Sequence, residues 1–167
     1  MTRNLARFIS TPYYKKCMKA AVLYEPLKLL IKNDVKVPKP DRNEVLVKVR
    51  VIGVCPSDVR YYTGEGIHKE VPYGENSFGL LGHEWSGEIV EVGSKITDFR
   101  AGDRVARCFA NYCGFCINCR LGMPNFCIGI EHEEHSGGFA EFVKFYIPPS
   151  GGRGLYKIPE GISYEEA

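Results

Sequence analysis

The chain has 167 residues, of which 44% are hydrophobic and 25% charged, and its formal net charge is +2. This length accommodates one domain with a core, or a domain with a tail, and the near-neutral charge argues against nucleic acid or a membrane surface as a partner. No apolar run approaches the roughly 20 residues of a membrane-spanning helix. Seven cysteines cannot all pair as disulfides, so the sequence predicts a metal-binding protein from a reducing compartment, the cytoplasm.

Residues 1–17 are basic and contain no acidic residue. We expect them to form a disordered tail, or to lie upstream of a natural start at Met18; an organelle transit peptide is the alternative. The domain is therefore expected to occupy residues 18–167.

Short runs rich in Val, Leu and Ile follow one another from Lys19 onward, separated by Pro, Asn, Asp and Gly. Along the third run, Val45, Val47 and Val49 alternate with other residues and form one continuously apolar face. A short helix is expected over residues 57–64, after Cys55. The sequence thus predicts a mainly β domain with short helices. Its expected strands cover residues 19–24, 29–37, 44–54, 85–93, 102–110 and 137–145.

Four cysteines define a lobe within residues 108–128: Cys113, Cys116, Cys119 and Cys127. Zinc takes four thiolate sulfurs at ~2.3 Å, and short Cys-x-x-Cys turns allow neighbouring sulfurs to converge on one ion. Four protein ligands leave no position for water or substrate. The spacing therefore predicts a closed, structural zinc site in an otherwise irregular lobe.

Two other interpretations of the cluster must be weighed. Bacterial ferredoxins also use Cys-x-x-Cys-x-x-Cys, but their fourth cysteine follows after three residues and precedes Pro. In this chain the gap is seven residues, and Ile128 follows the fourth cysteine. Disulfides between cysteines at i and i+3 have poor geometry. Colour from charge-transfer absorption would indicate an iron cluster.

A second set of metal-binding residue types is spread along the chain. Cys55, His83 and Glu84 supply a thiolate, an imidazole and a carboxylate, which are the ligand types of a catalytic zinc with an open position. Asp58 is placed to orient the imidazole of His83. Taken singly, a cysteine is more often a small hydrophobic residue, and a histidine an ordinary hydrogen-bonding group.

The spacing around His83 resembles the signature of the zinc-containing medium-chain alcohol and polyol dehydrogenases: Gly82-His83-Glu84-x-x-Gly87-x(5)-Gly93-x-x-Ile96. The resemblance extends from Met18 to Ala167. It implies a GroES-like, partly open β-barrel with a zinc-binding cysteine lobe. The other segments that carry it are residues 18–26, 55–58, 102–105, 113–127 and 137–141.

The resemblance also implies roles for individual residues. Cys55 and His83 resemble ligands of the catalytic zinc, and Glu84 resembles a direct ligand in the polyol branch. Because neighbouring residues of a regular strand point to opposite faces, ligation by both His83 and Glu84 requires a bend near Gly82. Ser57 resembles the hydroxyl that binds the substrate alcohol and passes on its proton, and Asp58 resembles the residue that supports the zinc-binding histidine.

The implied activity is zinc-assisted transfer of hydride from a small alcohol or polyol to NAD or NADP. Three features depart from the family pattern. Pro56 replaces a common glycine. Arg60, which stays protonated, stands where many relatives carry a proton-relaying histidine. The third protein ligand of the catalytic zinc in relatives lies just after the helix that begins near Ser163, beyond the end of this chain.

A dinucleotide-binding fingerprint of the form Gly-x-Gly-x-x-Gly is missing: residues 64–66 and 152–154 each contain only Gly-x-Gly. We therefore expect NAD or NADP to bind only through a Rossmann domain outside this chain, which a separate gene could encode. Two hypotheses follow. The chain is the catalytic zinc-binding domain of a dehydrogenase, incomplete without its cofactor domain, or it is a non-catalytic, zinc-stabilised remnant or interaction module.

Three further sets of residues carry expectations. Ser163 and Glu166 form a capping-box pattern that predicts the start of a helix, so the sequence is expected to continue past Ala167. His132 and His135 are three residues apart, not four as in zinc proteases, and are expected to lie in a solvated acidic loop. Cys17 and Cys108 are expected to be ordinary thiols.

Overall fold

The structure is a computed structural model, and it describes residues 16–65, 73–77, 80–108, 111–129, 137–149 and 154–167. Its strands are β1 (Cys17–Glu25), β2 (Lys28–Lys36), β3 (Glu44–Ile52), β4 (Trp85–Val92), β5 (Arg104–Arg107), β6 (Phe142–Tyr146) and β7 (Leu155–Lys157). Its α-helices are α1 (Pro56–Thr63) and α2 (Ile117–Arg120), and its 3₁₀ helices are η1 (Glu75–Ser77) and η2 (Pro124–Phe126). No helix in the described segments is long and apolar enough to span a membrane.

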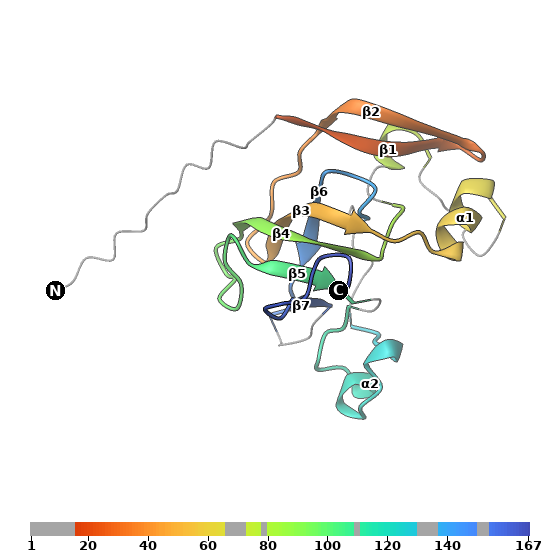
Figure 1. The fold of residues 1–167 in the computed structure, drawn as a ribbon. Coiled ribbons are helices and arrows are strands. Elements are labelled where there is room, and N and C mark those ends of the chain that lie inside the picture. Colours follow the sequence, from red (N-terminus) through yellow and green to blue (C-terminus); the bar gives the residue numbers. More distant parts are fainter. Residues whose placement is uncertain (1–15, 66–72, 78–79, 109–110, 130–136, 150–153) are drawn as a thin grey trace.

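The described strands form two antiparallel sheets that do not close into one barrel. β1 and β2 make a hairpin, and the larger sheet has the order β6-β3-β4-β5-β7. Figure 1 shows the hairpin above the larger sheet, α1 at one end, and the lobe that carries α2 projecting below. The mainly β, partly open architecture expected from the sequence is confirmed.

Strand β3 lies between two hydrophobic clusters and contributes to both. Val45 and Val47 are fully buried in the larger cluster beside Trp85, while Leu46 points to the opposite face. On that face it packs with Met18 and other residues beneath the hairpin. Burying such side chains stabilises the fold by about 1.5–3 kcal/mol each. The alternation in the sequence thus identified the buried face of β3, and the second face is buried because the hairpin covers it.

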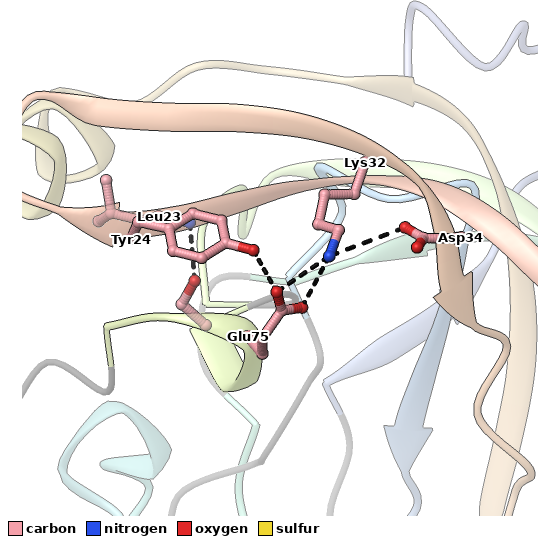
Figure 2. Close-up of polar contacts among 6 residues, drawn as sticks. Leu23, Tyr24, Lys32, Asp34 and Glu75 are labelled. Carbon is pink, nitrogen blue, oxygen red and sulfur yellow. Dashed lines mark hydrogen bonds and ion pairs between the residues drawn. The ribbon is translucent and has the colours of Figure 1, made fainter.

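The hairpin is also tied to η1, the short helix that precedes the segment around Gly82. The buried hydroxyl of Ser77 accepts a hydrogen bond of 2.7 Å from the backbone amide of Leu23. Figure 2 shows Tyr24 and Lys32 converging from the hairpin on the carboxylate of Glu75, with the ammonium of Lys32 2.9 and 3.0 Å from its two oxygens. These bonds fix η1 on the hairpin, at the approach to the candidate site described below.

Several expected elements differ in the structure. β1 begins at Cys17, one residue before the expected domain start, and the strand expected over residues 137–145 begins only at Phe142, although Ala140 makes an isolated bridge to Ala20. β7 was not predicted because it is three residues long and only its first residue is buried. The lobe, expected to be irregular, contains α2 and η2. Residues 1–15 of the expected tail, the histidines at 132 and 135, and parts of both glycine pairs lie outside the described residues.

The capping box near the C-terminal end is formed. The amide of Ser163 donates to the Glu166 carboxylate at 2.9 Å, and the amide of Glu166 donates to the Ser163 hydroxyl at 3.2 Å. The backbone of residues 164–166 is a turn. The capping box predicted from the sequence is thus present.

The carboxylate of Asp103 makes the free energy of unfolding depend on pH. Burial tends to raise the pKa of its carboxyl, but a 2.9 Å bond from the Lys157 ammonium and another of 2.9 Å from the Arg100 amide lower the pKa below its ordinary value. The stabilisation is therefore fully present above the unfolded-state pKa of about 4 and is lost as the pH falls through the lower folded-state pKa.

We expect Asp103→Asn to lower the free energy of unfolding at neutral pH, because the ion pair with Lys157 disappears. The deficit relative to wild type should shrink below about pH 4, where wild type also loses the charge. Urea denaturation of both proteins across this pH range measures it. A deficit that stays constant with pH would show that the carboxylate charge contributes nothing.

Candidate metal centres

The cysteine lobe brings four sulfurs together from three short pieces of chain. Cys113 lies before α2, Cys116 is the residue that caps it, Cys119 lies within it, and Cys127 follows η2. All four sulfurs lie within 4.8 Å of one another. The two short helices, α2 and η2, turn the chain so that Cys127 lies beside the other three cysteines.

The sulfur positions fit a single tetrahedral ion. The Sγ–Sγ distances are 3.4 Å between Cys116 and Cys119, 3.9 Å between Cys113 and Cys119, and 3.9 Å between Cys116 and Cys127. A tetrahedron with metal–sulfur bonds of ~2.3 Å has edges of about 3.8 Å. All four cysteines are free thiols in the structure, and the sulfurs are too far apart for disulfides.

Backbone amides around the cluster favour the thiolate forms that a metal requires. The amide of Cys113 donates to the sulfur of Cys127 at 3.2 Å, and the amide of Cys116 donates to the sulfur of Cys113 at 3.3 Å. Amides of Ile128 and Cys119 lower the pKa of Cys116 to about 6. Burial raises the pKa of Cys119 to about 12. Burial acts to raise the pKa of Cys127, but hydrogen bonds from the amides of Cys113 and Gly129 lower it below its ordinary value. The amides thus favour thiolates at Cys116 and Cys127, whereas burial opposes a thiolate at Cys119 in the absence of a cation.

The lobe has almost no hydrophobic core of its own. Cys113 is its one buried residue among those that the structure describes from 111 to 129. Its large apolar side chains point outward, with exposed fractions between 40% and 73%: Phe115, Ile117, Leu121, Met123, Phe126 and Ile128. Packing therefore contributes little to holding the lobe in shape.

A second group of candidate ligands lies at the α1 end of the larger sheet. Ligand atoms of Cys55, His83 and Glu84 lie within 4.8 Å of one another. Cys55 and His83 are half-buried, while Glu84 is exposed. A tetrahedral zinc with one sulfur, one nitrogen and one oxygen ligand has edges of about 3.3–3.6 Å. The residue types fit such an ion, and a three-residue set leaves a position open.

The carboxylate of Asp58 joins the two chain segments that supply this group. It is only 4% exposed. One oxygen accepts a 3.0 Å hydrogen bond from the amide of Cys55, which caps α1, and the other accepts a 2.8 Å bond from the amide of Gly82. The second oxygen also lies 3.6 Å from Nδ1 of His83, a contact longer than a hydrogen bond. Asp58 thus fixes the backbone on both sides of the site.

Two glycines shape the backbone beside the site. Gly82 has φ +82°, and a Cβ there would come within 2.4 Å of Ile52, so this position requires glycine. His83 and Glu84 precede β4 and lie outside any strand, so they need not point to opposite faces. The amide of Gly53 donates to the Glu84 carbonyl at 2.7 Å, and a Cβ at Gly53 would meet the Glu84 carboxylate at 2.9 Å. The residue type of Gly53 does not predict this contact.

The remaining predicted residues lie on α1. The hydroxyl of Ser57 is 3.4 Å from Nε2 of His83, at the edge of the candidate ligand group. Pro56 is the first residue of α1, where a missing amide proton has no cost. Arg60 lies in the last turn and is exposed. Cys17 and Cys108 are exposed and belong to neither group of candidate ligands.

The two hydrogen bonds of Asp58 lead to a prediction. Asp58→Asn keeps the shape of the side chain but turns an NH₂ group toward one of the two backbone amides, which then loses its acceptor. Leaving a buried donor unsatisfied costs about 1–3 kcal/mol. Urea denaturation of the metal-free protein should show this loss, whereas Ser57→Ala should change the free energy of unfolding much less. Equal stability of wild type and Asp58→Asn would contradict the assigned role.

Several known proteins similar to this chain are dehydrogenases. Sorbitol dehydrogenase of Bacillus subtilis is 37% identical over 153 residues, which are 90% of this chain and 41% of that protein. The alcohol dehydrogenase RspB of Escherichia coli CFT073, solved with NADH, superposes with a TM-score of 0.71 at 32% identity over 92% of this chain and 42% of that one. Alcohol dehydrogenase TADH from Thermus sp. ATN1 has a TM-score of 0.71 at 29% identity over 89% of this chain and 42% of that one.

The chain thus spans about 41% of the length of the curated sorbitol dehydrogenase that it matches. The alcohol dehydrogenase GroES-like domain matches residues 41–159, which include strands β3 to β7 and both candidate metal centres. Because this match covers well over half of the chain, the protein belongs to the alcohol dehydrogenase GroES-like domain family.

Proposed function

We propose that this domain binds two zinc ions and is the catalytic, zinc-binding part of an NAD(P)-dependent alcohol or polyol dehydrogenase. The observation that carries the proposal is the convergence of Cys55, His83 and Glu84 beside the hydroxyl of Ser57. Family membership supports the same assignment. Residues 18–167 are proposed to act as one unit, with the lobe at 108–128 as its structural zinc site.

The lobe is proposed to hold its zinc through Cys113, Cys116, Cys119 and Cys127. Four sulfurs within 4.8 Å of one another are close enough to bind one ion, and they lie too close together to enclose a cluster of several metal atoms. The closed ligand set gives this zinc a structural role. Because the lobe has little core, metal binding and folding of this segment are expected to be coupled.

The second zinc is proposed to be catalytic, held by Cys55 and His83 with Glu84 as a further ligand. When bound there, zinc acts as a Lewis acid that makes an alcohol more acidic. Ser57 would then bind the alcohol hydroxyl, accept its proton at Oγ and release its own hydroxyl proton outward to solvent. Asp58 would hold the backbone of both ligand segments, and so keep His83 in position. Arg60 stays protonated and therefore does not relay the proton onward.

Hydride transfer needs an acceptor, NAD or NADP. We do not propose that this domain binds it alone. The chain spans about 41% of sorbitol dehydrogenase, and the similar RspB structure contains NADH. We propose that a Rossmann domain, joined to this domain or separately encoded, binds NAD or NADP against the open side of the Cys55–His83–Glu84 group. The substrate class is a small alcohol or polyol.

A domain exchange tests the proposal. Residues 18–167 replace the matching region of B. subtilis sorbitol dehydrogenase, and zinc content and NAD-dependent polyol oxidation are measured together. We expect two zinc ions per chain and activity well above background. A variant with both Cys55→Ala and His83→Ala should retain one zinc and lose activity, whereas Cys108→Ser, which changes an exposed cysteine outside both groups, should match the parent.

A folded chimera that binds two zinc ions and oxidises no alcohol or polyol would contradict the catalytic assignment. One zinc per chain, lost on mutation of the lobe cysteines but not of Cys55, would instead support a non-catalytic zinc module.

A further inference from the structure

Gly129 occupies a position in the lobe where no side chain fits. A Cβ at this residue would lie 2.5 Å from the sulfur of Cys113 and 3.1 Å from its Cβ. Real Cβ atoms do not approach other atoms within 3.0 Å. The φ angle of Gly129 is not in the left-handed region, so its backbone conformation would suit any residue. The restriction therefore comes from the Cys113 side chain, mainly its sulfur, and not from the backbone.

Cys113 cannot move aside without leaving the sulfur cluster. Its side chain is buried, at 1% exposure. Its sulfur accepts hydrogen bonds from the amides of Cys116 at 3.3 Å and Phe115 at 3.5 Å, and it lies 3.9 Å from the sulfur of Cys119. A shift of even half an ångström would lengthen these contacts and distort the tetrahedron.

Gly129 also contacts the last cysteine of the set. Its amide donates to the sulfur of Cys127 at 3.4 Å. Gly129 therefore lies beside two of the four sulfurs. It leaves room for the Cys113 sulfur because it has no side chain, and its amide donates to the Cys127 sulfur.

We propose that Gly129 is a positioning residue for the lobe metal, setting the separation of Cys113 from Cys127 so that all four sulfurs reach one ion. The inference rests on the proposed zinc site in the lobe. Any side chain at residue 129 would displace Cys113 or carry the amide of residue 129 away from Cys127. In both cases metal affinity falls and the coordination geometry changes.

The test compares wild type, Gly129→Ala and the neighbouring control Ile128→Ala, whose side chain is 73% exposed. Each protein also carries Cys55→Ala and His83→Ala, so that only the lobe binds metal. Co²⁺ titration measures affinity, and the visible absorption of the bound Co²⁺ reports thiolate geometry. Trp85, the single tryptophan and buried in the main core, reports folding separately by fluorescence.

We expect Gly129→Ala to bind Co²⁺ about 10–100-fold more weakly, the range seen when groups that orient metal ligands are removed, and with a shifted spectrum. Ile128→Ala should match wild type, and Trp85 emission should be the same in all three proteins. Unchanged affinity and spectrum in Gly129→Ala would overturn the inference.

Two further outcomes are distinguishable. If wild type binds no metal in the lobe, the proposed zinc site fails, and the inference fails with it. If metal-free Gly129→Ala loses the buried Trp85 emission while metal-free wild type keeps it, residue 129 serves the general fold, which also overturns the positioning role.

Discussion

The shape of the cysteine lobe depends on one constraint: four sulfurs lie within 4.8 Å of one another. Thiolates at this distance repel one another, and the lobe around them has one buried residue among those described, with its large apolar side chains exposed. A divalent cation bound by all four sulfurs would remove that repulsion and link the pieces of chain that carry them.

A buried carboxylate has the corresponding role at the other candidate centre. Asp58 accepts hydrogen bonds from the amides of Cys55 and Gly82, so segments 24 residues or more apart meet at one side chain. The hairpin and η1 support the same region, because Glu75 and Ser77 bind strand residues Tyr24, Lys32 and Leu23 just ahead of Gly82. The ligands are thus placed by the larger sheet, the hairpin and α1 together.

Most of the fold could be predicted from the sequence, because alternating apolar residues directly report burial. β1 to β5 and α1 lie where the patterns of Val, Leu and Ile indicated, and Val45 and Val47 do face the main core. The pattern could not predict β7, since three residues with one buried side chain carry no period. It also missed α2 and η2, because the requirement to bring cysteines together produces these turns, and their apolar residues face solvent.

The candidate ligands could be chosen from residue type and spacing, whereas their supporting groups could not. Cysteine and histidine at suitable spacing indicate a metal site in a sequence. A backbone amide that donates to a sulfur cannot be recognised from residue types. Gly129 is one of 18 glycines, and only the position of Cys113 in space explains why a Cβ does not fit there. Ligation by both His83 and Glu84 was expected to require a bend near Gly82, but the use of the Gly82 amide by Asp58 could not be predicted.

The central claim is that one zinc ion binds all four lobe sulfurs. X-ray absorption at the zinc edge, on protein in which Cys55 and His83 are replaced by alanine, tests it most directly. The account predicts a single shell of four sulfur scatterers at ~2.3 Å. A shell containing nitrogen or oxygen, a metal–metal scattering peak, or a folded lobe without bound metal would contradict it.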